Sequence, residues 1–276
     1  MASIREQLEN LFAKILQGTV TREEGTMLIN SLARKNPEET IAEISDLINN
    51  PPQNMTPQVV FQTIAITRNR KFFDVLTATL DHKDEAVSIF ACEELATYFK
   101  EESKFVLEEH LNNESYNVRK SSAVTLQKIF GDEGINVLVR HILAKDSKSH
   151  YHRLTSAEGL LKAGKKGVDA MIKILNSGNS GAIVTIADVL GGVSKQIGDE
   201  DVPKIVDALI NAGDAGDFDA VVALLKTIAS LGPRVKPFEW YVRAYEDNAN
   251  PAVAAGAKAT LNAISPQKPQ KPVGQK

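Results

Sequence analysis

The chain has 276 residues, of which 43% are hydrophobic, 24% charged and 6% aromatic, and its net charge is −3. This composition is typical of a globular protein with an aliphatic core, and the charge provides no general attraction to nucleic acid. The single cysteine excludes a disulfide within the chain, and no apolar run of about 18 residues predicts a transmembrane helix. We therefore expect a cytoplasmic protein without a membrane segment.

Residues 1–37 are predicted to form an N-terminal helical cap. Ile4, Leu8 and Leu11 recur at helical spacing and mark one face of a first helix. In the sequence TREE, Thr21 and Glu24 stand three residues apart, as in a capping box that begins a second helix. A stack of repeats needs terminal helices with a polar outer side, and this is the role we expect of the segment.

Residues 38–264 carry a repeat. Seven large side chains, which we call the openers because a polar turn begins after each, are 31 to 36 residues apart: Leu47, Leu80, Leu111, Leu143, Leu175, Leu209 and Tyr245. In all units but the first, another apolar residue stands four positions earlier: Leu76, Leu107, Val139, Met171, Ile205 and Tyr241. A spacing of four places both residues on one face of a helix that ends near the opener.

A second helix is predicted after each polar turn. Asn, Asp, Ser and Gly dominate the turns, as expected where side chains bond the local backbone. Small residues recur within the second helices and allow close helix packing: Ala91, Cys92, Ser122, Ala123, Ser156, Ala157 and Ala187. Each unit is therefore predicted to be a helical hairpin that buries its apolar face only by stacking on its neighbours.

The repeat pattern D/N-x-x-V-R-x-x-A-x-x-L, seen best in SYNVRKSSAVTL, resembles HEAT repeats of the short, phycobilisome-lyase-like type. The arginine of this pattern is present at Arg119 and, less clearly, at Arg153. The resemblance implies an all-α fold, a right-handed HEAT-like α-solenoid of about seven helical hairpins with an N-terminal helical cap. We expect one repeat domain over residues 38–264, because no linker interrupts the pattern.

A row of mostly polar residues lies two positions before the openers, off the buried stripe. By analogy with HEAT proteins, the helix that ends at the opener is expected to line the concave face of the solenoid. Side chains of this row would then contact a partner protein, and we expect five of them to do so: Glu109, His141, Lys173, Asp207 and Arg243.

The segment RHILAKDSKSHYHRL holds the densest group of histidines. His150, His152 and Arg153 are possible contacts to a ligand or anion, with His141 on the preceding helix. Paired thiolates and an H-E-x-x-H motif are both lacking, so no metal site is predicted. A solvated basic turn explains the same residues.

Several enzyme classes find no support in the sequence. Helical-repeat hydroxylases hold iron with His-Glu dipeptides, and none of the five histidines precedes a glutamate. The glycine-rich turn NAGDAGDFD lacks the strand, loop and Gly-Lys-Ser/Thr ending of a phosphate-binding loop. HEAT-like DNA glycosylases use a basic face with tryptophans, whereas this chain has one tryptophan. We therefore expect no cofactor and a protein that is not an enzyme.

The segment 265–276, SPQKPQKPVGQK, has three prolines, three lysines and no acidic residue, and it is predicted to be a disordered tail. Taken together, the sequence predicts a protein-binding scaffold, adaptor or assembly factor that is a monomer or weak oligomer. One alternative is a bilin lyase subunit or chromophore-handling factor, which the family resemblance implies, with His141, His152 or Arg153 near the propionates. A third possibility is nucleic-acid binding, which the net charge disfavours.

Overall fold

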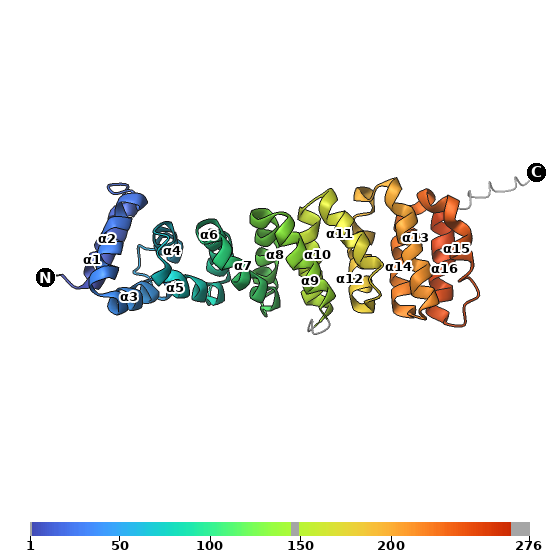
Figure 1. Cartoon of the computed structure of the whole chain (residues 1–276), viewed down its shortest axis with the longest axis horizontal. Coiled ribbons are helices and arrows are strands. Elements are labelled where there is room, and N and C mark those ends of the chain that lie inside the picture. Colours follow the sequence, from blue (N-terminus) through green and yellow to red (C-terminus); the bar gives the residue numbers. More distant parts are fainter. Residues whose placement is uncertain (1, 145–148, 266–276) are drawn as a thin grey trace, which may run out of the picture. The chain divides into compact units, whose positions relative to one another are not determined.

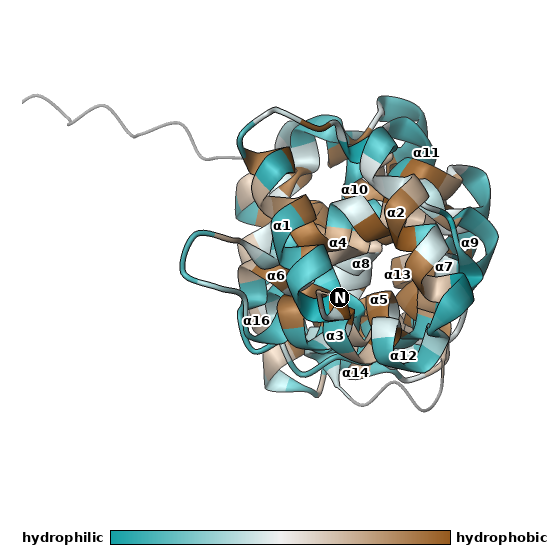
Figure 2. Cartoon of the chain, turned by 90° about the vertical axis from the view of Figure 1, so that its left-hand side faces the viewer, coloured by the Kyte–Doolittle hydropathy of each residue, from teal (hydrophilic) through white to brown (hydrophobic). Residues whose placement is uncertain are grey.

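The computed structural model describes residues 2–144 and 149–265, and the ordered elements within these ranges are all helices (Figure 1). The chain packs into two compact units, residues 1–137 and 138–276, whose border falls within α9 (Asp132–Leu143). Along the helices of both units, hydrophobic and hydrophilic stretches alternate, as amphipathic helices require (Figure 2). The predicted tail, apart from Ser265, lies outside the described residues.

The first unit contains a pair of helices followed by stacked hairpins. Short 3₁₀ turns complete several of the helices: η1 (Arg70–Phe72), η2 (Thr79–Asp81) and η3 (His110–Asn112). The α-helices before α9 are α1 (Ile4–Leu16), α2 (Arg22–Lys35), α3 (Pro37–Asn49), α4 (Pro57–Ile66), α5 (Phe73–Ala78), α6 (Glu85–Tyr98), α7 (Lys100–Glu109) and α8 (Tyr116–Phe130).

The second unit continues the same alternation of helix, polar turn and helix. Its 3₁₀ segments are η4 (Ser194–Gln196), η5 (Asp199–Asp201) and η6 (Gly232–Phe238). Its α-helices after α9 are α10 (His150–Lys162), α11 (Lys165–Leu175), α12 (Ser180–Gly192), α13 (Val202–Asp214), α14 (Phe218–Leu231), α15 (Glu239–Arg243) and α16 (Pro251–Ile264).

The predicted fold class, an all-α solenoid of helical hairpins, is confirmed. The openers lie near the ends of the first helices of hairpins in both units, although α13 continues to Asp214 beyond Leu209. The openers from Leu47 to Leu111 and from Leu175 to Leu209 are fully buried. The residues four positions earlier are buried as well at Leu76, Leu107, Met171 and Ile205. The spacing of the repeat thus identified the core stripe in these hairpins. In α9 the prediction was one residue too late, because Leu138 and Ile142 are buried whereas Val139 and Leu143 are half-buried. Tyr241 and Tyr245 are half-buried as well. The predicted domain limits at residues 37 and 264 stay predictions.

The second helices of successive hairpins pack closely against one another, most intimately at α6–α8, α12–α14 and α14–α16. The small residues that the sequence singled out lie at these contacts and are fully buried, among them Ala91, Ser122 and Ala187. Cys92 is part of the same layer, and burial raises the pKa of its thiol above the ordinary value. Its expected role as a small buried side chain is therefore confirmed.

Buried hydroxyl groups join the second helices in the second unit. Thr227 Oγ1 on α14 donates to the carbonyl oxygen of Ala187 on α12 at 2.7 Å. Thr260 Oγ1 on α16 donates to the carbonyl of Leu225 on α14 at 2.9 Å. Each hydroxyl also lies within hydrogen-bond distance of a carbonyl of its own helix, so its one proton always has an acceptor in an apolar layer.

Two corners between a second helix and the next first helix depend on glycine. Gly131 and Gly164 have φ of 55° and 60°, a conformation that glycine adopts without steric cost. Three residues later, a Cβ at Gly134 or Gly167 would lie 2.0 Å or 1.7 Å from a carbonyl oxygen of the preceding helix. The Gly-x-x-Gly spacing therefore permits a turn of one residue after α8 and of two residues after α10, each followed by close backbone contact.

The N-terminal pair of helices is fixed by the predicted capping chemistry. Thr21 accepts from the backbone N–H of Glu24 at 3.1 Å, and the Glu24 carboxylate accepts from the backbone N–H of Thr21 at 2.8 Å. The capping box is confirmed, and Ser3 and Glu6 form a second one at the start of α1. Arg5 connects α1 to α3 through its ion pairs with Glu43 and Asp46, which are on α3.

Candidate binding surfaces

Four of the five residues predicted to contact a partner are exposed on first helices. Glu109 is on α7 in the first unit, whereas Lys173, Asp207 and Arg243 are on α11, α13 and α15 in the second unit. We call these four residues the charged row. Their side chains alternate in sign along the second unit. Their role in partner binding stays a prediction.

Arg243 belongs to a local ion-pair group. Its guanidinium lies 2.5 Å from Glu239 and 3.7 Å from Glu246. Hydrogen bonds from Lys236 and Arg243 lower the pKa of Glu239 to about 2, so that carboxylate is ionised throughout the neutral range. The pairing with Glu239 holds Arg243 along the surface of α15.

Lys173 lies beside a denser charge network at the start of α13. The Asp201 carboxylate is fully buried and pairs with Lys165 Nζ at 2.7 Å and Lys204 Nζ at 2.8 Å. Burial alone would raise the pKa of Asp201, but the hydrogen bonds from both lysines lower it below its usual value. A cavity of about 450 Å³ is lined by these residues with Asp169, Ile172, Lys173 and Glu200.

The fifth predicted contact, His141, requires correction because the structure buries it. The residue is only 8% exposed, and its Nδ1 lies 2.9 Å from the hydroxyl of Ser156. Burial, together with the nearby positive charges of His152 and Arg153, lowers the pKa of His141 to about 4. His141 is thus a neutral core residue at pH 7, and it presents no surface to a partner.

The other residues of the histidine segment are held by polar partners. His152 Nδ1 lies 2.8 Å from the hydroxyl of Ser149, whereas His150 Nδ1 lies 3.0 Å from Thr185 Oγ1 on α12. The side chain of His152 therefore points towards its own turn, and that of His150 points towards the next hairpin. The predicted role of these histidines in ligand binding stays a prediction.

The side chain of Arg153 donates its hydrogen bonds to backbone carbonyls. Its guanidinium donates to the carbonyls of Ile142 at 3.1 Å and Ala144 at 3.3 Å, where α9 ends. Arg119 does the same one hairpin earlier and donates to Asn113 and Glu114 at 2.7 and 2.8 Å. The arginine of the repeat pattern therefore satisfies carbonyls that the end of the preceding helix leaves without partners. The sequence showed the arginine pattern, but it did not show that these side chains bond the backbone carbonyls.

Arg153 and His150 also line a shallow cleft on the second helices of the second unit. Its volume is about 400 Å³, and it runs from the first turn of α10 over α12 and α14 to the start of α16. Small and apolar residues such as Gly181, Val184 and Val222 form part of the lining. Asp188, Asp219 and Lys226 add charges of both signs. Sequence reasoning missed this cleft, because residues from four helices form it.

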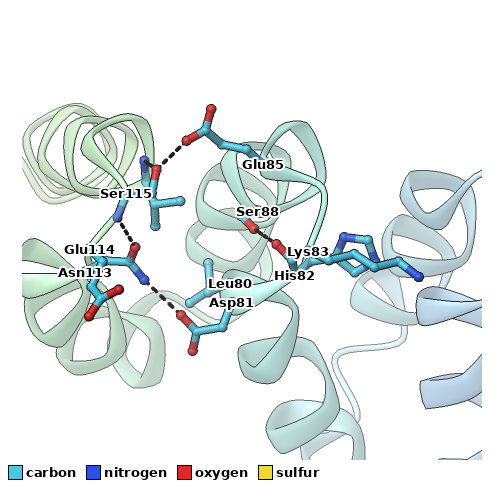
Figure 3. A pocket seen from close by; sticks show the side chains of 10 residues that line it. Leu80, Asp81, His82, Lys83, Glu85, Ser88, Asn113, Glu114 and Ser115 are labelled. Atoms are coloured by element: carbon cyan, nitrogen blue, oxygen red, sulfur yellow. Dashed lines mark hydrogen bonds between the residues drawn. The ribbon is translucent and has the colours of Figure 1, made fainter.

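A second cleft, of about 460 Å³, lies between the turns that precede α6 and α8 (Figure 3). Asn113 donates to Asp81 at 2.9 Å, and Ser115 donates to Glu85, so the two turns are joined across the cleft. The hydrogen bonds from Ser115 and Asn117 lower the pKa of Glu85. The polar groups at this cleft hold the hairpins together, and their spacing of about one repeat is the signal that could have predicted the pairs.

Two other kinds of site are absent from the part of the chain that the structure describes. Within residues 2–144 and 149–265, no group of three or more His, Cys, Asp or Glu side chains is placed to hold a metal ion. Over the same part of the chain, every helix is too short or too polar to cross a membrane.

Comparison with known proteins finds likeness in the fold only. No family model and no curated protein match the chain. The solved structure of human deoxyhypusine hydroxylase with glycerol matches 95% of this chain and 96% of its own, with 12% identity and a TM-score of 0.38. An engineered protein matches 87% of this chain and 68% of its own (17% identity, TM-score 0.37). A designed armadillo repeat protein, YIII(Dq)4CqI, matches 81% of this chain and 99% of its own, with 14% identity and a TM-score of 0.31.

The expectation that the chain is not an enzyme requires correction. A hydroxylase is among the solved structures that match it, so the helical-repeat fold gives no reason to exclude catalysis. The lack of His-Glu dipeptides concerns only one way of holding iron. Fold likeness at this level assigns neither an activity nor a substrate to this chain.

Proposed function

We propose that the chain is a protein-binding scaffold whose recognition surface includes the charged row. One observation carries the proposal: Lys173, Asp207 and Arg243 occupy the same repeat position on successive first helices, and all three are exposed. Charges arranged in alternating sign select a partner with the complementary order and disfavour uniformly charged polymers. Stacked repeats commonly present such rows to partner proteins.

The test compares two sets of charge reversals in the tagged full chain. The row variant is K173E/D207K/R243E, and the control is D188K/K226E/K258E on the second helices of the same unit. All six side chains are exposed, and both variants change the net charge by the same amount and sign. Proteins captured from the native cell extract are identified by mass spectrometry, and circular dichroism confirms folding.

A stoichiometric protein partner that the row variant loses and the control variant keeps would support the proposal. Equal retention by the row variant and the unaltered chain would refute it, and so would a loss confined to the control. Glu109 is tested separately through E109K, because it belongs to the other unit. We expect E109K to weaken capture of the same partner.

We also infer that the repeats are of the short, phycobilisome-lyase-like type. The common backbone contacts of Arg119 and Arg153 support this, because the arginine is part of the pattern. The bilin-handling alternative relied on His141, His152 and Arg153 as ligand contacts. No specific observation favours it, since His141 is buried and Arg153 bonds the backbone.

A further inference from the structure

The shallow cleft of about 400 Å³ on the second helices of the second unit contains charged side chains without partners. Asp188 on α12 and Lys226 on α14 both line it, and both are exposed. Over residues 2–144 and 149–265, neither side chain takes part in an ion pair or a side-chain hydrogen bond, and the same holds for Asp219 at the first turn of α14. Opposite charges therefore face this cleft without being neutralised by the protein.

The first unit shows what the same two repeat positions do when they pair. Counted from the openers, Glu93 on α6 occupies the position of Asp188, and Lys128 on α8 occupies that of Lys226. Glu93 and Lys128 form an ion pair across their two helices. Aspartate is one methylene shorter than glutamate, in keeping with the open pair on α12 and α14. The repeat thus supplies a carboxylate and an ammonium group at matching positions in both units, and the second unit leaves them apart.

The rest of the lining indicates which kind of molecule fits. Val184 and Val222 lie one turn before the unpaired charge of their own helix and are half-buried, so they provide an apolar floor. Apart from His150, the charged groups of the lining are two carboxylates and two cations: Asp188, Asp219, Lys226 and Arg153. Balanced charges of this kind favour a ligand that carries both signs over a simple anion or cation. The volume is in the range of pockets for small molecules.

We propose that this cleft binds a small zwitterion with an apolar body, of the size of a dipeptide. The ammonium group of the ligand pairs with Asp188, its carboxylate pairs with Lys226, and its apolar side chains cover the two valines. The ligand thereby takes the place of the ion pair that joins the corresponding positions of α6 and α8. The charged row lies on first helices, so the protein can bind this ligand whether or not the row recognises a partner protein.

The test adds L-leucyl-L-leucine to the isotope-labelled full chain and follows the backbone amide signals by two-dimensional NMR. We expect saturable shifts in α12 and α14, with a dissociation constant of roughly 1 mM. Two altered probes check the charges, since N-acetyl-leucyl-leucine lacks the ammonium group and leucyl-leucinamide lacks the carboxylate. Each should bind roughly fivefold more weakly, the weight of one exposed ion pair. Equal affinities of the three probes, or no saturable shift with leucyl-leucine, would overturn the proposal.

The site variant is D188N/K226M, and the matched control is E93Q/K128M at the same repeat positions of the first unit. Both leave the net charge unchanged and alter only exposed side chains, so we expect both proteins to fold. The site variant should bind leucyl-leucine roughly tenfold more weakly than the unaltered chain, whereas the control should retain its affinity. Unchanged affinity in the site variant, or an equal loss in the control, would contradict the assignment of the site.

The single variant D188N provides a second readout, which is independent of any loss of stability. If Asp188 holds the ammonium group, D188N should bind leucyl-leucine and its acetylated form equally well, because the contact that distinguishes them is gone. A preference for the free ammonium group as large as in the unaltered chain would place that group elsewhere and overturn the proposal.

Discussion

At the scale of single residues, two glycines show how a small side chain is required by its neighbours. Gly164 turns the backbone after α10 with positive φ, and Gly167 then lies against the end of that helix. The carbonyl of Leu160 occupies the place where a Cβ of residue 167 would be. The two glycines serve different needs, one conformational and one steric.

The substitution Gly167→Ala should therefore destabilise the protein by about 2–4 kcal/mol, because the backbone must move to accept one methyl group. Gly192→Ala is the matched control, since a Cβ there meets nothing within 4 Å and φ is not positive. At the control position we expect a change within about 1 kcal/mol, neutral or stabilising. Urea unfolding monitored by circular dichroism measures both, and equal stabilities would contradict the steric explanation.

His141 makes a second prediction at this scale, which concerns pH. Its pKa of about 4 in the folded chain lies below the ordinary value of 6.5, so the unfolded chain binds more protons between these values. The free energy of unfolding should hence be unaffected by His141 above pH 6.5 and fall as the pH decreases towards 4. The loss amounts to at most about 3 kcal/mol.

The comparison variant is His141→Asn, which keeps a polar atom near Ser156 but does not titrate. Stability is measured for both proteins at several pH values from 7 to 4.5. We expect the curve of the unaltered chain to fall more steeply than that of the variant. Parallel curves would show that His141 does not take up a proton on unfolding in this range.

At the scale of helices, the close packing of α12, α14 and α16 combines small side chains with hydroxyl groups. Thr227 is 1% exposed and reaches the carbonyl of Ala187 on the neighbouring helix. A hydroxyl placed here would be costly without an acceptor. The interhelical bond therefore fixes how α14 lies against α12, in addition to satisfying the group.

Replacing Thr227 by valine keeps the shape and removes the donor. We expect a loss of about 1 kcal/mol in the free energy of unfolding, the usual net worth of one buried hydrogen bond. Thr97→Val is the control, since the exposed Thr97 bonds only its own helix, through Glu93. An equal loss in the free energy of unfolding for Thr97→Val would mean that the interhelical hydrogen bond adds no stability beyond that of a bond within one helix. Thermal and urea unfolding provide the values.

At the scale of the whole molecule, hairpins contact mainly their neighbours in sequence, and the chain falls into two compact units. Stability in such an array is approximately a sum of local terms. A weakened hairpin is therefore expected to open more readily than distant ones, and the opening should appear as faster amide exchange.

We predict that Gly167→Ala raises amide hydrogen exchange most in α10, α11 and α12. Helices α4 and α6 in the other unit should keep the exchange rates of the unaltered chain. Hydrogen exchange followed by mass spectrometry at peptide resolution measures the difference. A uniform increase over all helices would mean that the two units unfold together, contrary to the local picture.

Much of this architecture was determined by the sequence alone. The spacing of the openers identified the hairpins and their core stripe, and Thr21 with Glu24 identified a helix start. These features are local or periodic, because helical geometry sets which residues share a face. The same spacing predicted five exposed residues two positions before the openers, and four of them, the charged row, are exposed.

Tertiary structure alone decided the environment of individual polar side chains. His141 occupies an exposed position by the repeat pattern, yet Ser156 and the packing of α10 enclose it. Arg153 looked available to a ligand, but the carbonyls at the end of α9 take its donors. Burial and hydrogen-bond partners depend on the volumes and orientations of residues from adjoining helices, which a repeat spacing does not specify. For the same reason, only the fold revealed the two clefts.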